Sequence, residues 1–127
     1  YGRHRADMMF PAGTLIDRGV VVAGGSDAPV TDHRPLLGIS QAMTRTTQDG
    51  DVCGIEHATT LDTAIRMHTI NGAYASFEEH LKGSLEPGKL ADLVLLAEDL
   101  RDIDPQAVRD VSVVRTYVGG KLVHRVR

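Results

Sequence analysis

The stretch VVVAGGSDAPV, residues 20–30, decides the fold. Its first four residues form an unbroken apolar run of the kind found in a parallel strand covered on both faces. The two glycines that follow let the backbone bend without a Cβ clash, and Pro29 restricts the residue before it to an extended conformation. The pattern therefore predicts a parallel strand that ends in a turn holding the Asp27 carboxylate in one direction.

Two interpretations of Asp27 follow from its position. In parallel α/β folds, reactive groups lie at the carboxyl ends of strands, which makes Asp27 a candidate catalytic residue. Alternatively, Ser26, Asp27 and Pro29 are ordinary turn residues that satisfy local backbone amides, which is the commoner case for such a segment taken alone. The segment by itself leaves both interpretations open.

Apolar residues at helical spacing predict several helices around this strand. The best marked begins after Thr60, whose hydroxyl can cap its free amides, and is expected to end at Asn71 and Gly72. Residues 6–17 suit either a helix around Pro11 or two short turns. The other predicted helices span residues 36–46 and 73–81.

The last third of the chain is rich in β-forming residues. Pro87 and Gly88 turn the backbone into a predicted strand over residues 90–97. Gly119 and Gly120 separate the two arms of VSVVRTYVGGKLVHRV, which predicts a hairpin. Three strands are too few to close a sheet against solvent, so we expect this tail to need other β structure.

Composition restricts the function classes. A chain of 127 residues with 42% hydrophobic positions suits one globular domain. A net charge of -3, from 14 basic and 17 acidic residues, gives no basic surface for nucleic acid or an anionic membrane. The sequence has neither an apolar run of roughly 18 residues nor a signal-peptide core, which predicts a cytoplasmic protein. The single cysteine, Cys53, excludes an internal disulfide and a multi-cysteine zinc site.

Five segments in a fixed order carry a family resemblance. They are GSDAPV, AMTRTT, NGAYA, KGSLEPGKLADLVLL and TYVGGKLV. Together they resemble the C-terminal part of the amidohydrolase superfamily, in the branch of the N-substituted formamide deformylases and related metal-dependent amidohydrolases. The resemblance covers nearly the whole chain, and the combination is specific although each segment alone is weak.

The resemblance implies a fold, a reaction and a role for Asp27. The implied fold is α/β, the C-terminal fragment of a (β/α)8 metal-dependent hydrolase barrel, or TIM barrel, followed by strands of a small β-sandwich domain. Residues 1–82 would supply the last barrel strand and its helices, and residues 83–127 the strands of the small domain. The implied reaction is hydrolysis of a non-peptide carbon–nitrogen bond in a small amide or formamide.

The resemblance also implies a divalent metal, with zinc as the expected ion, which lowers the pKa of a bound water toward about 7. Asp27 is then the catalytic general base and a candidate metal ligand. The family takes its other ligands from earlier barrel strands: a His-X-His pair, a lysine or acidic residue midway, and two further histidines. No two of the six histidines here lie at a spacing that puts both rings on one metal.

We therefore expect the chain to be inactive alone, with the remaining ligands and the substrate-binding residues outside it. Tyr1 opens the chain without an initiating methionine, so a processed piece, a remnant of a longer protein and a naturally short protein all stay open.

Three further side chains have two interpretations each. His33 is expected to be a solvated loop residue, with the mouth of a substrate site as the alternative. His68 shares an apolar helical face, which favours a packed, hydrogen-bonded core histidine over a functional one. Arg45 matches the family's Thr-Arg pattern and is expected to brace the barrel through a carboxylate, with substrate contact as the alternative.

Two other functions are compatible with parts of the pattern. One is a non-enzymatic β-rich module that self-associates or pairs with another chain through unpaired strand edges, which also leaves a homo-oligomer open. The other is a nucleotide-binding turn at residues 20–30. That turn lacks the G-x-G-x-x-G spacing and a helix starting directly after the glycines.

Overall fold

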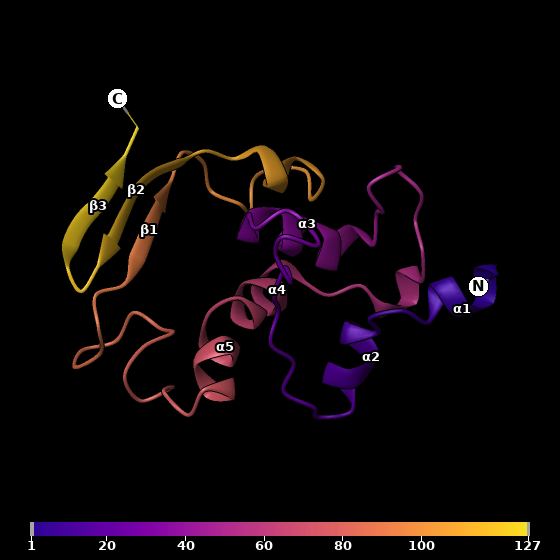
Figure 1. The fold of residues 1–127 in the computed structure, drawn as a ribbon, viewed down its shortest axis with the longest axis horizontal. Coiled ribbons are helices and arrows are strands. Elements are labelled where there is room, and N and C mark those ends of the chain that lie inside the picture. Colours follow the sequence, from indigo (N-terminus) through magenta and orange to yellow (C-terminus); the bar gives the residue numbers. More distant parts are fainter. Residues whose placement is uncertain (1, 127) are drawn as a thin grey trace.

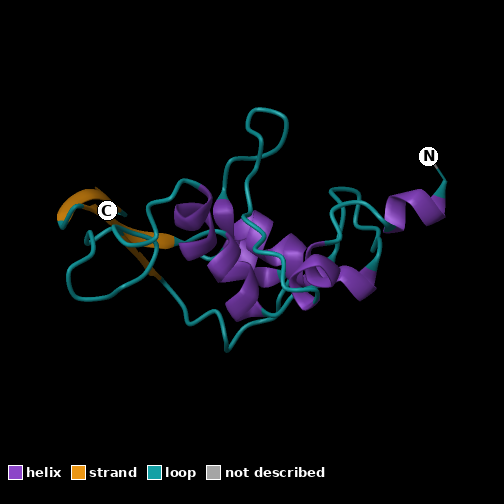
Figure 2. Ribbon diagram, turned by 90° about the horizontal axis from the view of Figure 1, so that it is seen from below, coloured by secondary structure: helices purple, strands orange, loops and turns teal. Residues whose placement is uncertain are grey.

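The computed structural model describes residues 2–126. The molecule is elongated, with helices in the middle, a sheet at the C-terminal end and α1 at the opposite end (Figure 1, Figure 2). The helices are α1 Arg3–Asp7, α2 Ala12–Asp17, α3 Pro35–Thr44, α4 Leu61–Met67 and α5 Ile70–Ala75, with short 3-10 turns η1 Ile55–His57 and η2 Ala107–Asp110. The strands are β1 Leu93–Leu96, β2 Val113–Val118 and β3 Lys121–Arg125.

Local signals place several helix boundaries as predicted. The Thr60 hydroxyl accepts a hydrogen bond from the backbone N–H of Thr63 at 3.3 Å, which caps α4. Pro35 occupies the first turn of α3, where its missing N–H has no cost. The region around Pro11 forms two short helices, because Pro11 is the N-cap of α2 and α1 has already ended at Asp7.

The helix boundaries predicted at Asn71 and over residues 73–81 are wrong. The helical backbone breaks earlier, at Thr69, and Asn71 lies inside α5. Asn71 does not stop the helix because its side-chain amide is used in a tertiary contact, donating to the carbonyl of Val22 at 2.9 Å. The next helix ends at Ala75 because Phe77 adopts φ +61, in the left-handed region that closes a helix.

Residues 20–23 are the largest departure from the predicted secondary structure. They form no strand with any other part of residues 2–126, although exposed and half-buried positions alternate as in a strand from Val21 to Ser26. The half-buried positions lie toward the helices, whereas the exposed positions are open to solvent. Only one of the two faces predicted to be buried is therefore covered. The half-buried positions are Val22, Gly24 and Ser26, and the exposed ones are Val21, Ala23, Gly25 and Asp27.

The core joins the helices to the chain that precedes β2. Its buried members are Ile39 of α3, Ala64 of α4 and Val108 of η2, and Val108 is fully buried. The buried Ser40 hydroxyl donates to the carbonyl of Pro105 at 2.8 Å, which fixes η2 against α3. The helical part is therefore completed by residues that lie between β1 and β2.

The N-terminal helices pack on the loop before α4. Asp7 accepts a hydrogen bond from the backbone N–H of Gly54 at 2.9 Å, and Arg3 donates to the carbonyl of Val52 at 2.6 Å. Gly54 has φ +61, and a Cβ there would lie 2.0 Å from the carbonyl oxygen of Asp7. This contact is so close that only glycine fits.

The C-terminal sheet is antiparallel in the order β1-β2-β3. The predicted hairpin is confirmed: Gly119 and Gly120 adopt φ +54 and +77 between β2 and β3, as a tight two-residue turn requires. The first strand is shorter than the predicted 90–97. All of β3 is exposed, and both β1 and β3 present an edge that no other described strand covers.

Candidate functional site

Asp27 lies in a tight turn at the end of the extended segment. Its backbone adopts φ +52, which aspartate tolerates better than most residues. The Asp27 carbonyl accepts from the N–H of Val30 at 2.9 Å, the Thr31 hydroxyl donates to the Ser26 carbonyl, and the Ala28–Pro29 peptide bond is cis. The turn is thus held by backbone contacts, and within residues 2–126 the Asp27 carboxylate has no hydrogen-bond partner.

The Asp27 side chain is exposed, in the turn that follows the extended segment. It does not line the neighbouring hollow, whose walls are formed by residues on both sides of it in sequence. Exposed and half-buried positions alternate from Val21 to Ser26, and Asp27, in the turn that follows, is exposed.

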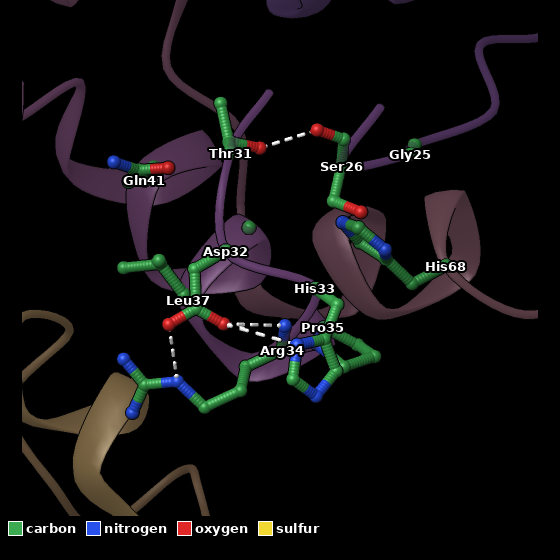
Figure 3. Close-up of a pocket in the computed structure, with 12 residues that line it drawn as sticks. Gly25, Ser26, Thr31, Asp32, His33, Arg34, Pro35, Leu37, Gln41 and His68 are labelled. Atoms are coloured by element: carbon green, nitrogen blue, oxygen red, sulfur yellow. Dashed lines mark hydrogen bonds and ion pairs between the residues drawn. The ribbon is translucent and has the colours of Figure 1, made fainter. Parts of the chain in front are cut away.

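The hollow beside this turn has a volume of about 270 Å³. It is formed by the loop before α3, the first turns of α3 and the end of α4. Figure 3 shows Ser26 and His68 on one side and Leu37 and Gln41 on the other. Its polar side chains are Ser26, Thr31, Asp32, His33, Arg34, Gln41 and His68.

His68 is the half-buried titratable group of this hollow. Burial lowers the pKa of His68, so the ring is neutral near neutral pH. The ring lies against two glycines: a Cβ on Gly24 would lie 2.7 Å from Nε2, and one on Gly38 would lie 2.9 Å from Cε1. The ring is packed against other residues as predicted, but it lies half-buried at the hollow and not in the core, and neither ring nitrogen has a hydrogen-bond partner within residues 2–126. The sequence signal for packing was the apolar helical face of His68, whereas its contact with Gly24 and Gly38 depends on the fold.

Asp32 and Arg34 form a local ion pair at the rim of the hollow. The Asp32 carboxylate accepts from the backbone N–H of Arg34 at 2.9 Å and from its Nε, also at 2.9 Å. The backbone hydrogen bond, together with the guanidinium, lowers the pKa of Asp32. His33 beside them has a side chain that is 86% exposed, which matches the solvated loop residue predicted from the sequence.

Arg45 braces the structure but not through a carboxylate, as the sequence had suggested. Its guanidinium donates to three backbone carbonyls: those of Cys53 at 3.0 Å, Phe10 at 2.8 Å and Met9 at 2.5 Å. Arg45 itself has φ +56 and closes α3. These bonds tie the N-terminal segment to the loop before α4, and Arg45 does not line the hollow.

The described residues contain no cluster of three or more histidine, cysteine, aspartate or glutamate side chains able to hold a metal ion. Among the histidines, His57 is buried with Nδ1 2.7 Å from the Thr14 hydroxyl, whereas His4, His80 and His124 are exposed. Cys53 is half-buried and unpaired. No helix within residues 2–126 has the length and apolar character needed to cross a bilayer.

The fold has a counterpart among solved structures. The crystal structure of an amidohydrolase from Thermotoga maritima MSB8 superimposes with a TM-score of 0.66 at 24% sequence identity. The match covers 89% of this chain and 25% of that chain. The described helices and small antiparallel sheet thus have the fold of part of that protein.

Sequence comparison establishes the family. Residues 1–124 match the Amidohydrolase family (Amidohydro_3), and the chain belongs to it. The chain is 39% identical to the N-substituted formamide deformylase of Arthrobacter pascens, over 90% of this chain and 21% of that protein. It is 36% identical to the 5-methylthioadenosine/S-adenosylhomocysteine deaminase of Teredinibacter turnerae, over 91% of this chain and 25% of that protein. The chain therefore spans about a quarter or less of the length of these relatives.

Proposed function

We propose that this chain is the C-terminal part of a metal-dependent amidohydrolase that hydrolyses a non-peptide carbon–nitrogen bond in a small amide or formamide. The family membership of residues 1–124 carries the proposal. A deformylase and a deaminase among the relatives support it, because both names denote cleavage of a carbon–nitrogen bond. Since the chain spans 21% and 25% of those proteins, the activity is assigned to the full-length polypeptide.

The extended segment supports its assignment as the last strand of a (β/α)8 barrel. Within residues 2–126, the backbone amides of Val21, Val22 and Ala23 have no hydrogen-bond partner. The end of α4 and α5 hold the segment, since the Met67 carbonyl accepts from the Gly24 N–H at 2.9 Å and the Asn71 amide donates to the Val22 carbonyl at 2.9 Å, as helices packed on a barrel strand would. Neighbouring barrel strands would supply the missing backbone partners, and the C-terminal sheet would belong to a small β domain.

Asp27 is the proposed general base. An exposed carboxylate without a hydrogen-bond partner, at the end of an extended segment, is free to accept the proton of an attacking water. The water oxygen then forms a bond to the carbonyl carbon. As the carbon–nitrogen bond breaks, Asp27 returns the proton to the departing nitrogen.

The residues of this chain do not fit a metal ion by themselves. A zinc site takes three or four protein ligands, whereas residues 2–126 bring no three histidine, cysteine, aspartate or glutamate side chains together around Asp27 or elsewhere. We therefore propose that the metal, with zinc as the expected ion, is held largely by residues outside this chain. When bound, such an ion lowers the pKa of water and polarises the carbonyl.

Chelation tests the metal-dependent class. The full-length polypeptide is expected to hydrolyse members of a panel of N-substituted formamides and small amides. The assay measures the amine that is released. Prolonged dialysis against a chelator should remove at least about 90% of that activity, and added Zn²⁺ should restore it, since the ion supplies the reactive water. Full activity in a chelated sample whose metal content is shown to be nil would contradict the proposal.

A β-rich pairing module remains the second candidate, supported by the exposed apolar side chains of the sheet. Val94 and Leu95 of β1, Val118 of β2, and Leu122 and Val123 of β3 are each between 47% and 59% exposed. Unpaired strand edges with apolar side chains favour pairing with further β structure.

Gel filtration separates the two candidates. If the sheet is completed within a longer amidohydrolase, the full-length polypeptide should elute at the same volume over a 100-fold range of concentration, whereas the 127-residue chain alone should associate as concentration rises. Concentration-dependent association of the full-length polypeptide that Leu122→Lys abolishes would favour the pairing module. A 127-residue chain that stays monomeric throughout would count against both.

A further inference from the structure

The joint between α4 and α5 holds the backbone that leads to Asp27. The carbonyl of Met67, the last residue of α4, accepts from the N–H of Gly24 at 2.9 Å. The side-chain amide of Asn71, in α5, donates to the carbonyl of Val22 at 2.9 Å. His68 lies between Met67 and Asn71 in sequence, and its ring packs on the same segment, at Gly24.

The ring occupies space that two glycines leave free. A Cβ on Gly24 would approach Nε2 to 2.7 Å, Cε1 to 2.9 Å and Cδ2 to 3.0 Å, and a Cβ on Gly38 would approach Cε1 and Nε2 to 2.9 Å. Neither Gly24 nor Gly38 has a positive φ, so the backbone conformation at either position does not require glycine. The requirement is the room for the His68 ring.

We infer that His68 is a positioning residue for Asp27, acting as a rigid spacer between the Gly24–Ser26 segment and the start of α3. This inference rests on the proposed general-base role of Asp27. With the ring removed, the segment could collapse into the hollow of about 270 Å³ and turn the Asp27 carboxylate away from its present direction. A displacement of about 1 Å at a reacting group is enough to cost roughly 100-fold in rate.

The surroundings of His68 favour a steric role over a proton-transfer role. Of the charged groups that line the same hollow, Asp32 is bonded to Arg34, and the His33 side chain is 86% exposed at the rim. No carboxylate of the described residues reaches the His68 ring. A flat side chain that carries no titratable proton should therefore replace it.

A mutant cycle in the full-length polypeptide tests the inference. His68→Ala and Gly38→Ala, each alone, should lower kcat by about 10- to 100-fold with KM changed by less than about twofold. The double variant should be no slower than His68→Ala, because the added Cβ no longer meets a ring. His68→Gln should restore most of kcat. His124→Ala, on the exposed β3, is the matched control and should keep full activity.

A second readout does not depend on turnover. The 13C resonance of the Asp27 carboxyl carbon, assigned by its loss in Asp27→Asn, should shift in His68→Ala and in Gly38→Ala, and should return toward its original position in His68→Gln. The urea midpoint of each variant reports whether the fold persists; if Gly38→Ala is unfolded, His68→Ala and His68→Gln decide alone.

The outcomes are distinguishable. If Asp27→Asn stops turnover but His68→Ala does not slow it, the positioning role is wrong while the proposed function stands. Equal losses of kcat in His68→Ala and His68→Gln would indicate proton transfer and overturn the inference. The inference would also be overturned if the kcat of the double variant fell by the product of the two single effects of His68→Ala and Gly38→Ala. If Asp27→Asn keeps its turnover, the proposed general-base role of Asp27 fails while the amidohydrolase class stands, and an unchanged Asp27 resonance in His68→Ala would remove the positioning role as well.

Discussion

Replacement of Asp27 with Asn should lower the turnover of the full-length polypeptide by at least about 100-fold, the scale of lost general-base help. The amide keeps the size and most of the shape of the carboxylate but cannot accept the proton of the attacking water. The Asp27 side chain makes no hydrogen bond within residues 2–126, so its loss should leave the fold unchanged. Steady-state kinetics, with circular dichroism to monitor the fold, provide the measurement.

Asp49→Asn is the matched control for this experiment. Asp49 is also an exposed loop carboxylate, but it is distant from the turn in sequence and does not line the hollow beside it. It should retain wild-type kcat and KM. Near-normal turnover of Asp27→Asn would remove Asp27 from the mechanism, and an equal loss in both variants would point to a general effect of surface charge.

Gly54→Ala should be the most destabilising single-methyl substitution in the N-terminal half. Two costs add: an L-residue at φ +61 is strained by roughly 1–2 kcal/mol, and the Cβ would lie 2.0 Å from the Asp7 carbonyl oxygen. Relief of that overlap must move the backbone of α1, which costs about another 1–3 kcal/mol. We expect the free energy of unfolding to fall by about 3 kcal/mol.

Gly50→Ala separates the two costs. Gly50 also has a positive φ, +92, but nothing lies within 4 Å of the position its Cβ would take. This variant should lose only the strain, roughly 1–2 kcal/mol. Urea unfolding of both variants gives the comparison. If the two lose the same stability, the close approach of α1 to the loop before α4 is not maintained in solution.

Short-range interactions explain which parts of the fold the sequence predicts well. The Gly119–Gly120 hairpin and the Thr60 cap each depend on residues within a few positions of one another, so the local sequence contains all the information. Asn71 shows where this reasoning fails. As a polar residue followed by glycine it predicts a helix end, but its side-chain amide donates to the Val22 carbonyl, 49 residues away, and Asn71 lies in the first turn of α5, after the break at Thr69.

The candidate site was likewise predicted only in part from the sequence. The ordered motifs indicated the family, which the match over residues 1–124 confirms, and the turn chemistry singled out Asp27. The partners of Arg45 could not be predicted, because they are backbone carbonyls, which carry no side-chain signal, and two of them belong to the distant residues Met9 and Phe10. His68 was missed as a neighbour of the Asp27 turn because its place depends on two glycines that only the fold brings together.

By itself, the sequence determined the amidohydrolase family, the hairpin and the turn at Asp27, because motif order and turn chemistry are written in neighbouring residues. Only the tertiary structure decided that residues 20–23 are covered on one face and that the His68 ring fills the space left by Gly24 and Gly38. Strand pairing and side-chain packing depend on which distant segments meet, and an apolar run or a histidine has the same sequence signal whether or not its partners are in place.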